Sequence, residues 1–298
     1  MRADRPQDRV FAWALGLVLV LAGLVSGASS FGARGAAVGV ALGGSLAVAG
    51  SRYMGRRSAR RRALLAAPFP EKWRRYLLDH CDHYDRLPSE WKVRFENDLR
   101  LFLLEKRITG VEVEVTDELR LLVAASAVTL SLGWPDYEWD QLTEVLLYPQ
   151  DFDRDYRFGK GDQLGESAGW GTIILSVPAL LESFDDPDDA FHVGFHEFAH
   201  LLDADQGESD GILAGLDEAQ ARQWLTVAEK ERERLRKGRS VLDPYGEESP
   251  AEFLGVAVEA FFEVPLAMRL RHPEMYGLLR AYFRQDPAAA DDARGLEI

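Results

Sequence analysis

An uncharged stretch near the N-terminus constrains the fold of this chain more than any other feature of its sequence. No charged residue occurs in residues 10–33, a run of 24 residues. A helix needs about 20 apolar residues to cross a bilayer. After Arg34 alone, a second uncharged run covers residues 35–51. The two runs predict a transmembrane helical hairpin, with helices over about residues 10–30 and 34–51.

Small residues in both runs favour close packing of the two helices. Gly35, Gly39 and Gly43 recur every four residues in the second run, and Gly16 and Gly23 lie in the first. This spacing lets two membrane helices approach closely. The alternative is a cleavable signal peptide, because a basic start, an apolar stretch and small residues also begin the chain.

The charge of the chain divides where this segment ends. The whole chain carries a net charge of −14, but residues 1–62 hold ten arginines and two acids, a net +8, so residues 63–298 carry −22. Arginines flank both outer ends of the hairpin, which places both ends in the cytoplasm by the positive-inside rule. We therefore expect residues 10–51 to lie in the inner membrane, with the Arg-rich flank on anionic lipid. The acidity of residues 63–298 argues against nucleic acid as a partner.

The pattern of residues 63–298 predicts one α+β domain that is mostly helical and has a small sheet. Residues 143–148 and 172–177 each have the composition of a strand and each end at a proline. Helices are expected over residues 71–107, broken at Pro88, over residues 116–133 and through most of the chain after Pro187. No alternation of strands and helices supports a Rossmann fold. Residues 150–171 are expected to form a loop.

The segment HEFAH, residues 196–200, has the metal-binding pattern HExxH. His196 and His200 are four residues apart, so they lie on one helical face and can bind one zinc ion. Glu197 lies beside that ion and can accept a proton from water. We expect this helix to begin at residues 186–187, because an acid followed by a proline is a strong helix start, and to end by Gly207.

Residues around this motif limit the kind of site. Residues eight apart on a straight helix are separated by about 12 Å along the axis, so His192 and His200 cannot hold one ion. We expect His192 in the wall of the site. A metzincin would need glycine and histidine where this chain has Asp203 and Gln206, which excludes that subclass.

A catalytic zinc site needs a third protein ligand, and three glutamates are candidates. Glu218 belongs to a strongly charged helix, where acids usually form a solvated face. Glu252 follows Ser249 by three residues, which is a capping box and gives it a structural role. Glu259 is the only charge between residues 253 and 262. A lone buried carboxylate is costly unless it is paired or binds metal, so we predict Glu259 as the ligand, a partner arginine being the alternative.

Three longer segments are more specific than HExxH alone: LSVPALLESFDDPDDAFHVGFHEFAHLLDADQG, LDPYGEESPAEFLGVAVEAFFEVP and RHPEMYGLLRAYFRQDP. Together with Tyr148-Pro149 and Gly165-Glu166-Ser167, they resemble the Mlc titration factor A family of bacterial zinc peptidases, from about residue 70 to 287. The resemblance implies a zincin-like domain with a gluzincin-type site, similar to the catalytic domain of anthrax lethal factor. It implies one zinc ion per chain, held by His196, His200 and Glu259, with Glu197 as catalytic base. Asp203 matches the acid that supports a zinc ligand in the family.

The expected function is a membrane-anchored, zinc-dependent peptidase that acts on a peptide or protein substrate. Tyr245 is a candidate for stabilising the oxyanion, a packed loop tyrosine being the alternative. The strand at residues 172–177 is expected to offer an edge to an extended peptide. The resemblance implies a transcriptional regulator as a partner, although the family's characterised soluble members lack the hairpin. The alternative function is a membrane-tethered binding module that holds zinc structurally and sequesters a regulatory protein without cleaving it.

Overall fold

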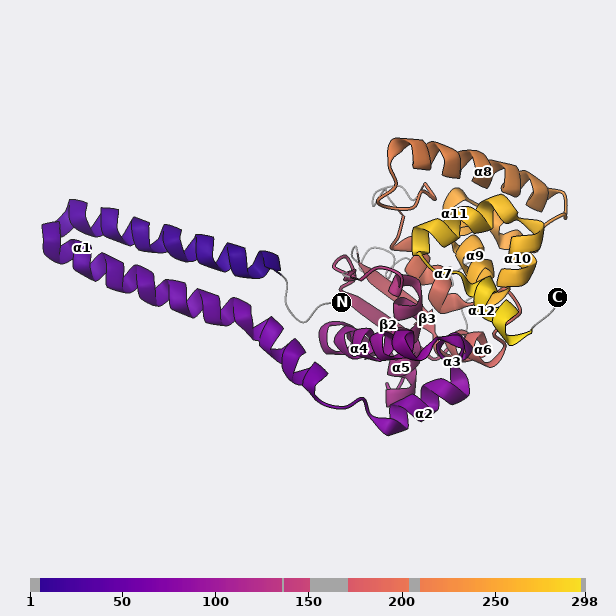
Figure 1. The fold of residues 1–298 in the computed structure, drawn as a ribbon, viewed down its shortest axis with the longest axis horizontal. Helices are drawn as coiled ribbons and strands as arrows, with labels where there is room; N and C mark the ends of the chain where they lie inside the picture. Colours follow the sequence, from indigo (N-terminus) through magenta and orange to yellow (C-terminus); the bar gives the residue numbers. More distant parts are fainter. Residues whose placement is uncertain (1–5, 136, 151–170, 204–209, 296–298) are drawn as a thin grey trace. The chain divides into compact units, whose positions relative to one another are not determined.

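The computed structural model describes residues 6–135, 137–150, 171–203 and 210–295. The chain divides into two compact units, Met1–Pro68 and Phe69–Ile298. Helix α1 (Pro6–Ala66) makes up the described part of the first unit, and all other elements belong to the second (Figure 1).

Helix α1 folds back on itself, so that its two legs pack side by side (Figure 1). Gly32 has a φ of +62°, a backbone conformation that residues other than glycine rarely adopt. The legs touch through glycines: a Cβ added to Gly23 would overlap the carbonyl oxygen of Gly39, and one added to Gly27 would overlap that of Gly35. Helix α1 therefore forms a hairpin whose legs touch at glycines, Gly23 and Gly39 among those that the sequence singled out. That the two legs span a membrane stays a prediction.

The outer surface of this hairpin is apolar. Leu17 is 62% exposed and Leu42 61% exposed. Within the described residues one stretch, Gly32–Ala49, is long and apolar enough to cross a membrane, and the apolar stretch Gly16–Ser29 of the other leg is shorter. The first unit thus carries an extended apolar surface that an aqueous solvent would not stabilise.

The second unit contains a three-stranded parallel sheet in the order β1-β2-β3. Strand β1 (Arg107–Gly110) pairs with β2 (Glu144–Tyr148), which pairs with β3 (Thr172–Ser176). Strands β2 and β3 are the two that the sequence predicted. Helix α5 (Asp117–Ser131) connects β1 to β2, so one parallel βαβ unit exists where no strand–helix alternation was expected. Strand β1 was missed because its four residues, RITG, are too few to show an alternating pattern.

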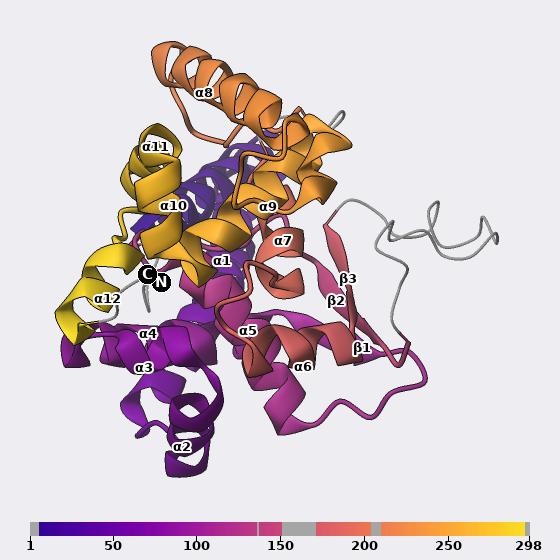
Figure 2. The same ribbon diagram turned by 90° about the vertical axis from the view of Figure 1, so that its right-hand side faces the viewer.

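The other elements of the second unit, in the residues that the structure describes, are helices, which confirms the predicted mostly helical α+β class. Helix α7, which carries HExxH, contacts both β3 and α9 and so lies between the sheet and the C-terminal helices (Figure 2). The helices are α2 (Glu71–His80), α3 (Asp82–Arg86), α4 (Ser89–Glu105), α6 (Val177–Asp185), α7 (Val193–His200), α8 (Glu218–Arg236), α9 (Pro250–Glu263), α10 (Pro265–Arg271), α11 (Pro273–Phe283) and α12 (Pro287–Arg294), with a short 3₁₀ helix η1 (Pro244–Glu247).

Helix α7 begins at Val193, later than the predicted start at residues 186–187. The acid-proline signal falls instead in the turn after α6. There the Asp189 side chain accepts a hydrogen bond from the backbone N–H of Phe191 at 2.8 Å, a local bond that competes with helix formation. His192 then caps α7, because its Nδ1 accepts a hydrogen bond from the backbone N–H three residues later.

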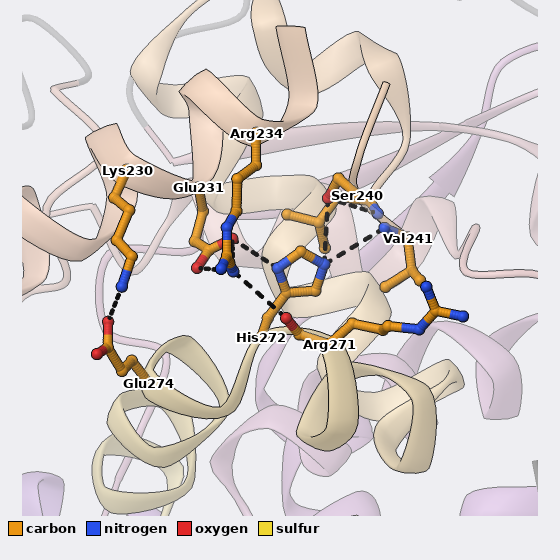
Figure 3. A network of polar contacts seen from close by, with 9 residues as sticks. Lys230, Glu231, Arg234, Ser240, Val241, Arg271, His272 and Glu274 are labelled. Carbon is orange, nitrogen blue, oxygen red and sulfur yellow. Dashed lines mark hydrogen bonds and ion pairs between the residues drawn. The ribbon is translucent and has the colours of Figure 1, made fainter. Parts of the chain in front are cut away.

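A buried polar network ties α8 to the junction of α10 and α11 (Figure 3). Glu231 of α8 lies 2.6 Å from Nδ1 of His272, and both side chains are almost fully buried. The other ring nitrogen of His272 accepts a hydrogen bond from the backbone N–H of Val241 at 3.3 Å, so Nδ1 carries the proton and donates to Glu231. Arg234 also donates to Glu231 at 3.0 Å.

Replacing Glu231 by alanine should therefore destabilise the protein by about 1–3 kcal/mol, because His272 Nδ1–H would be left buried without an acceptor. Urea unfolding of the full chain in detergent would measure the change. Glu233→Ala is the matched control on the same helix, since its half-exposed carboxylate pairs with Arg236 and Lys237 at the surface, and such pairs contribute little. Equal stabilities of the two variants would contradict the assigned role of the network.

Candidate metal centre

Helices α7 and α9 bring two histidines and one carboxylate together. His196 Nε2 lies 2.8 Å from Oε2 of Glu252, and His200 Nε2 lies 3.7 Å from the same oxygen. Potential ligand atoms of His196, Glu197 and His200 all lie within 4.8 Å of one another. Two imidazole nitrogens facing one carboxylate oxygen are the donor set that a divalent zinc ion prefers.

Glu259, the predicted third ligand, faces the opposite side of the His196 ring. Its Oε1 lies 3.2 Å from His196 Nδ1 and also accepts a hydrogen bond from the backbone N–H of His192 at 3.4 Å. A carboxylate on the second nitrogen of a metal-binding histidine fixes the tautomer and the orientation of the ring. The geometry therefore favours Glu252 over Glu259 at the metal. Glu218 lies on the surface of α8, where it pairs with Arg222.

Glu252 lies at the site although the sequence suggested only a capping role. Ser249 does cap α9, since its hydroxyl accepts a hydrogen bond from the backbone N–H of Glu252 at 3.1 Å. The Glu252 carboxylate does not complete the capping box, and it contacts the two histidines instead. Sequence reasoning did not choose Glu252 as the ligand because the capping pattern already gave it a role. The pattern could not show that only the backbone N–H of Glu252 takes part in the cap.

The electrostatics of the site suit a metal ligand and a base. Burial lowers the pKa of His200 to about 4, so its ring is neutral and free to bind metal near neutral pH. Burial raises the pKa of Glu197 to about 7, opposed by His196 and supported by Glu252 and Glu259. A carboxylate with a pKa near 7 can both accept and donate a proton at that pH. Burial also acts on Glu252, but its hydrogen bond to His196 holds its pKa below the usual value.

The remaining predicted residues take different positions. Tyr245 lies at the centre: its hydroxyl bonds to Glu252, and its ring centroid is 5.9 Å from that of His196. Asp203 accepts a hydrogen bond from the backbone N–H of Gly211 at 2.8 Å, and its charge acts on His200. His192 is the helix cap described above. The segment 165–167 lies outside the described residues.

Gly255 of α9 leaves the space that the His196 ring occupies. A Cβ at this position would lie 2.5 Å from His196 Nδ1 and 2.8 Å from Nε2, so only glycine leaves room for the ring against the helix. Sequence reasoning missed Gly255, although a glycine inside an otherwise apolar helix signals a close approach of this kind.

Replacing Gly255 by alanine should displace the His196 ring and lower zinc affinity by about 10–100-fold, the range for losing a group that orients a ligand. Competition with a chromophoric chelator would measure the affinity. Gly277→Ala in α11 is the matched control, because a Cβ there meets no atom within 4 Å. That change should leave zinc affinity unaltered. Unchanged affinity in Gly255→Ala would show that the ring does not depend on this contact.

Comparison with known proteins confirms the predicted family resemblance. A Mlc titration factor A of Yersinia enterocolitica is 31% identical over 241 residues, covering 76% of this chain and 83% of the relative. That of Pectobacterium atrosepticum is 32% identical over 207 residues, covering 63% and 77%. An uncharacterised Synechocystis protein is 29% identical over 244 residues, covering 76% and 89%. Residues 55–284 match the family described as glucose-regulated metallo-peptidase M90, and the chain belongs to this family.

Proposed function

We propose that this protein is a membrane-anchored zinc peptidase that hydrolyses peptide bonds in peptide or protein substrates. The observation that carries the proposal is the convergence of His196, His200 and Glu252 beside Glu197, whose pKa burial raises to about 7. Membership of a metallopeptidase family supports the reaction class.

One zinc ion per chain would be held by Nε2 of His196, Nε2 of His200 and the carboxylate of Glu252. Glu252 replaces Glu259 as third ligand in this proposal, because a carboxylate on Nδ1 of His196 cannot share an ion held at Nε2. Glu259 orients His196 instead. Three protein ligands leave one position open, as catalytic zinc sites require.

Zinc bound here would supply a Lewis acid for the scissile carbonyl and for the attacking water. Glu197 would accept a proton from that water and later deliver it to the leaving amine. Tyr245 would donate a hydrogen bond to the oxyanion that develops at the carbonyl. Its ring, whose centroid is 5.9 Å from that of His196, lies beside the metal ligands, which supports that role.

An extended substrate would add to the sheet at β3. Among the described strands β3 is at the edge of the sheet, and it contacts the helix that carries the histidines. Backbone hydrogen bonds to an edge strand bind peptides with little regard to sequence. A regulatory protein is a candidate substrate or partner, since several relatives are named for titration of Mlc.

The hairpin of α1 would anchor the protein in the inner membrane, with the second unit in the cytoplasm. Its exposed leucines and valines and the arginines between residues 52 and 62 support this placement. Membrane fractionation and a reporter fused after residue 62 would test it. A reporter that is active only outside the cytoplasm would overturn the orientation.

Peptide cleavage by the full chain in detergent would test the reaction. Cleavage of a fluorogenic peptide library should stop when a chelator removes the metal and should return with added zinc. Cleavage that continues in the metal-free protein would refute the proposal. One bound zinc ion with no cleavage of any peptide would favour the alternative, a tethered binding module.

A further inference from the structure

A cavity follows the metal centre along the chain, and its lining residues take no part in the chemical steps described above. Its volume is about 720 Å³, within the usual range of roughly 300–1,000 Å³ for ligand-binding pockets. Its wall begins at Leu201, the residue after the ligand His200, and continues through Leu202 to the loop around Leu213. Helices α8 and α11 supply the opposite walls.

The apolar walls of this cavity are fixed by hydrogen bonds. The indole N–H of Trp134 donates to the carbonyl of Tyr282 at 2.8 Å, and that of Trp224 donates to the carbonyl of Gly211 at 2.6 Å. The Trp134 and Tyr282 rings also contact each other edge to face, with centroids 5.0 Å apart. The network of His272 holds α8 against the junction before α11 (Figure 3). The pocket is therefore formed before any ligand arrives.

Arg284 supplies a positive charge at the cavity. It has a φ of +53° at the C-terminus of α11, a position that glycine usually takes. Its guanidinium, which is exposed, forms no hydrogen bond or ion pair with any residue in the described part of the chain. A strained arginine without a partner, in a unit rich in acids, indicates a role in binding a negative group.

Glutamine side chains supply neutral polar groups in the same walls. Gln141, Gln220 and Gln223 line the cavity. The amide nitrogen of Gln141 already donates to Tyr137 and to the Leu201 carbonyl, and the amide oxygen of Gln220 accepts from the backbone N–H of Asp217. The oxygen of Gln141 can still accept from a peptide backbone, and the nitrogen of Gln220 can still donate to one. Among the lining residues that the structure describes, the only acid is Asp203, whose carboxylate is buried and bonded to the backbone of Gly211. The described lining is thus aromatic and amide-rich, and Arg284 is its cation.

We propose that this cavity binds a peptide segment of the substrate that carries a carboxylate beside an apolar or aromatic side chain. The aromatic walls would hold the apolar side chain, the glutamines the peptide groups, and Arg284 the carboxylate. An acidic side chain and a C-terminal carboxylate share this chemistry. This inference rests on the proposed peptidase function in one respect: that function identifies the bound peptide as a substrate.

Tryptophan fluorescence of the full chain in detergent would test the binding, because Trp134 and Trp224 line the cavity. Binding is measured in the Glu197→Gln variant without zinc, so that the result does not depend on catalysis. Three probes distinguish the sources of charge: acetyl-Leu-Phe-Glu-Phe-Leu-amide, its analogue with glutamine in place of glutamate, and that analogue with a free C-terminus.

At least one carboxylate-bearing probe should bind about tenfold more tightly than the uncharged one, and Arg284→Gln should remove that difference. The matched control is Arg280→Gln, one turn earlier in α11, whose side chain pairs with Asp286 outside the cavity. It should leave all three affinities unchanged. Equal binding of the three probes, or an unchanged preference in Arg284→Gln, would overturn the proposal. So would binding of none of the probes.

Discussion

Replacing Glu197 by glutamine should lower the rate of peptide cleavage by about 10²–10⁴-fold, the usual contribution of a general base, and leave one zinc ion bound. Glutamine keeps the shape and the hydrogen-bonding oxygen of the side chain but cannot accept the proton of the attacking water. The kcat for a fluorogenic peptide and the zinc content of the same sample would be measured together.

The control for Glu197→Gln is a carboxylate remote from the site. Glu274→Gln changes an exposed acid of α11 that pairs with Lys230, and it should alter neither kcat nor zinc content. If the Glu197→Gln enzyme cleaves at the normal rate, Glu197 is not the base. If the variant loses its zinc instead, Glu197 has a role in holding the metal and the proposed division of roles is wrong.

Glu252→Gln should lower zinc affinity by more than about 100-fold, whereas Glu259→Gln should lower it by about 10–100-fold at most, as for a group that only orients a ligand. The reason is the face of the His196 ring that each carboxylate meets. Glu252 lies at Nε2, which also faces His200, and Glu259 lies at Nδ1. Equilibrium competition with a chelator of known affinity would measure both variants.

Glu218→Gln completes this series, because its exposed carboxylate pairs only with Arg222 among the described contacts and should not affect zinc. The two substitutions in α9 are isosteric, so a difference between them cannot come from lost packing volume. The reverse order of affinities, with zinc lost in Glu259→Gln and kept in Glu252→Gln, would restore the original assignment of Glu259.

The choice between Glu252 and Glu259 as third metal ligand shows which part of the site could be predicted from the sequence. The burial of the Glu259 carboxylate was predicted correctly, since this side chain is almost fully buried. The cost of burying a charge required a partner for that carboxylate, but a histidine ring meets this requirement just as a metal ion would. In the structure the partner is the ring of His196. Which nitrogen of His196 each carboxylate meets depends on how α7 crosses α9, and that crossing has no signature in the sequence of either helix.

Local sequence signals for the ends of helices and strands predicted the structure correctly where no other local conformation suited the same residues. The helix predicted from residue 116 begins there with Thr116 as its cap, and Ser249 caps α9 although Glu252 does not complete the capping box. Strand β2 ends directly before its proline, and β3 ends two residues before Pro178. The signal at residues 186–187 failed because an acid and a proline begin a helix or form a turn equally well. The hydrogen bond from Phe191 to Asp189 selects the turn, and the helix start moves to His192.

The sequence by itself determined the HExxH pattern, the mostly helical class, the regular glycine spacing in the N-terminal segment and the family. These depend on spacings of a few residues along one helix, or on composition, and both can be read directly. Only the tertiary structure decided the pairing of Glu252 with the histidines, the space that Gly255 leaves for His196, and the cavity beside Arg284. Each joins residues of different helices, and such contacts are set by packing angles that a linear pattern does not encode.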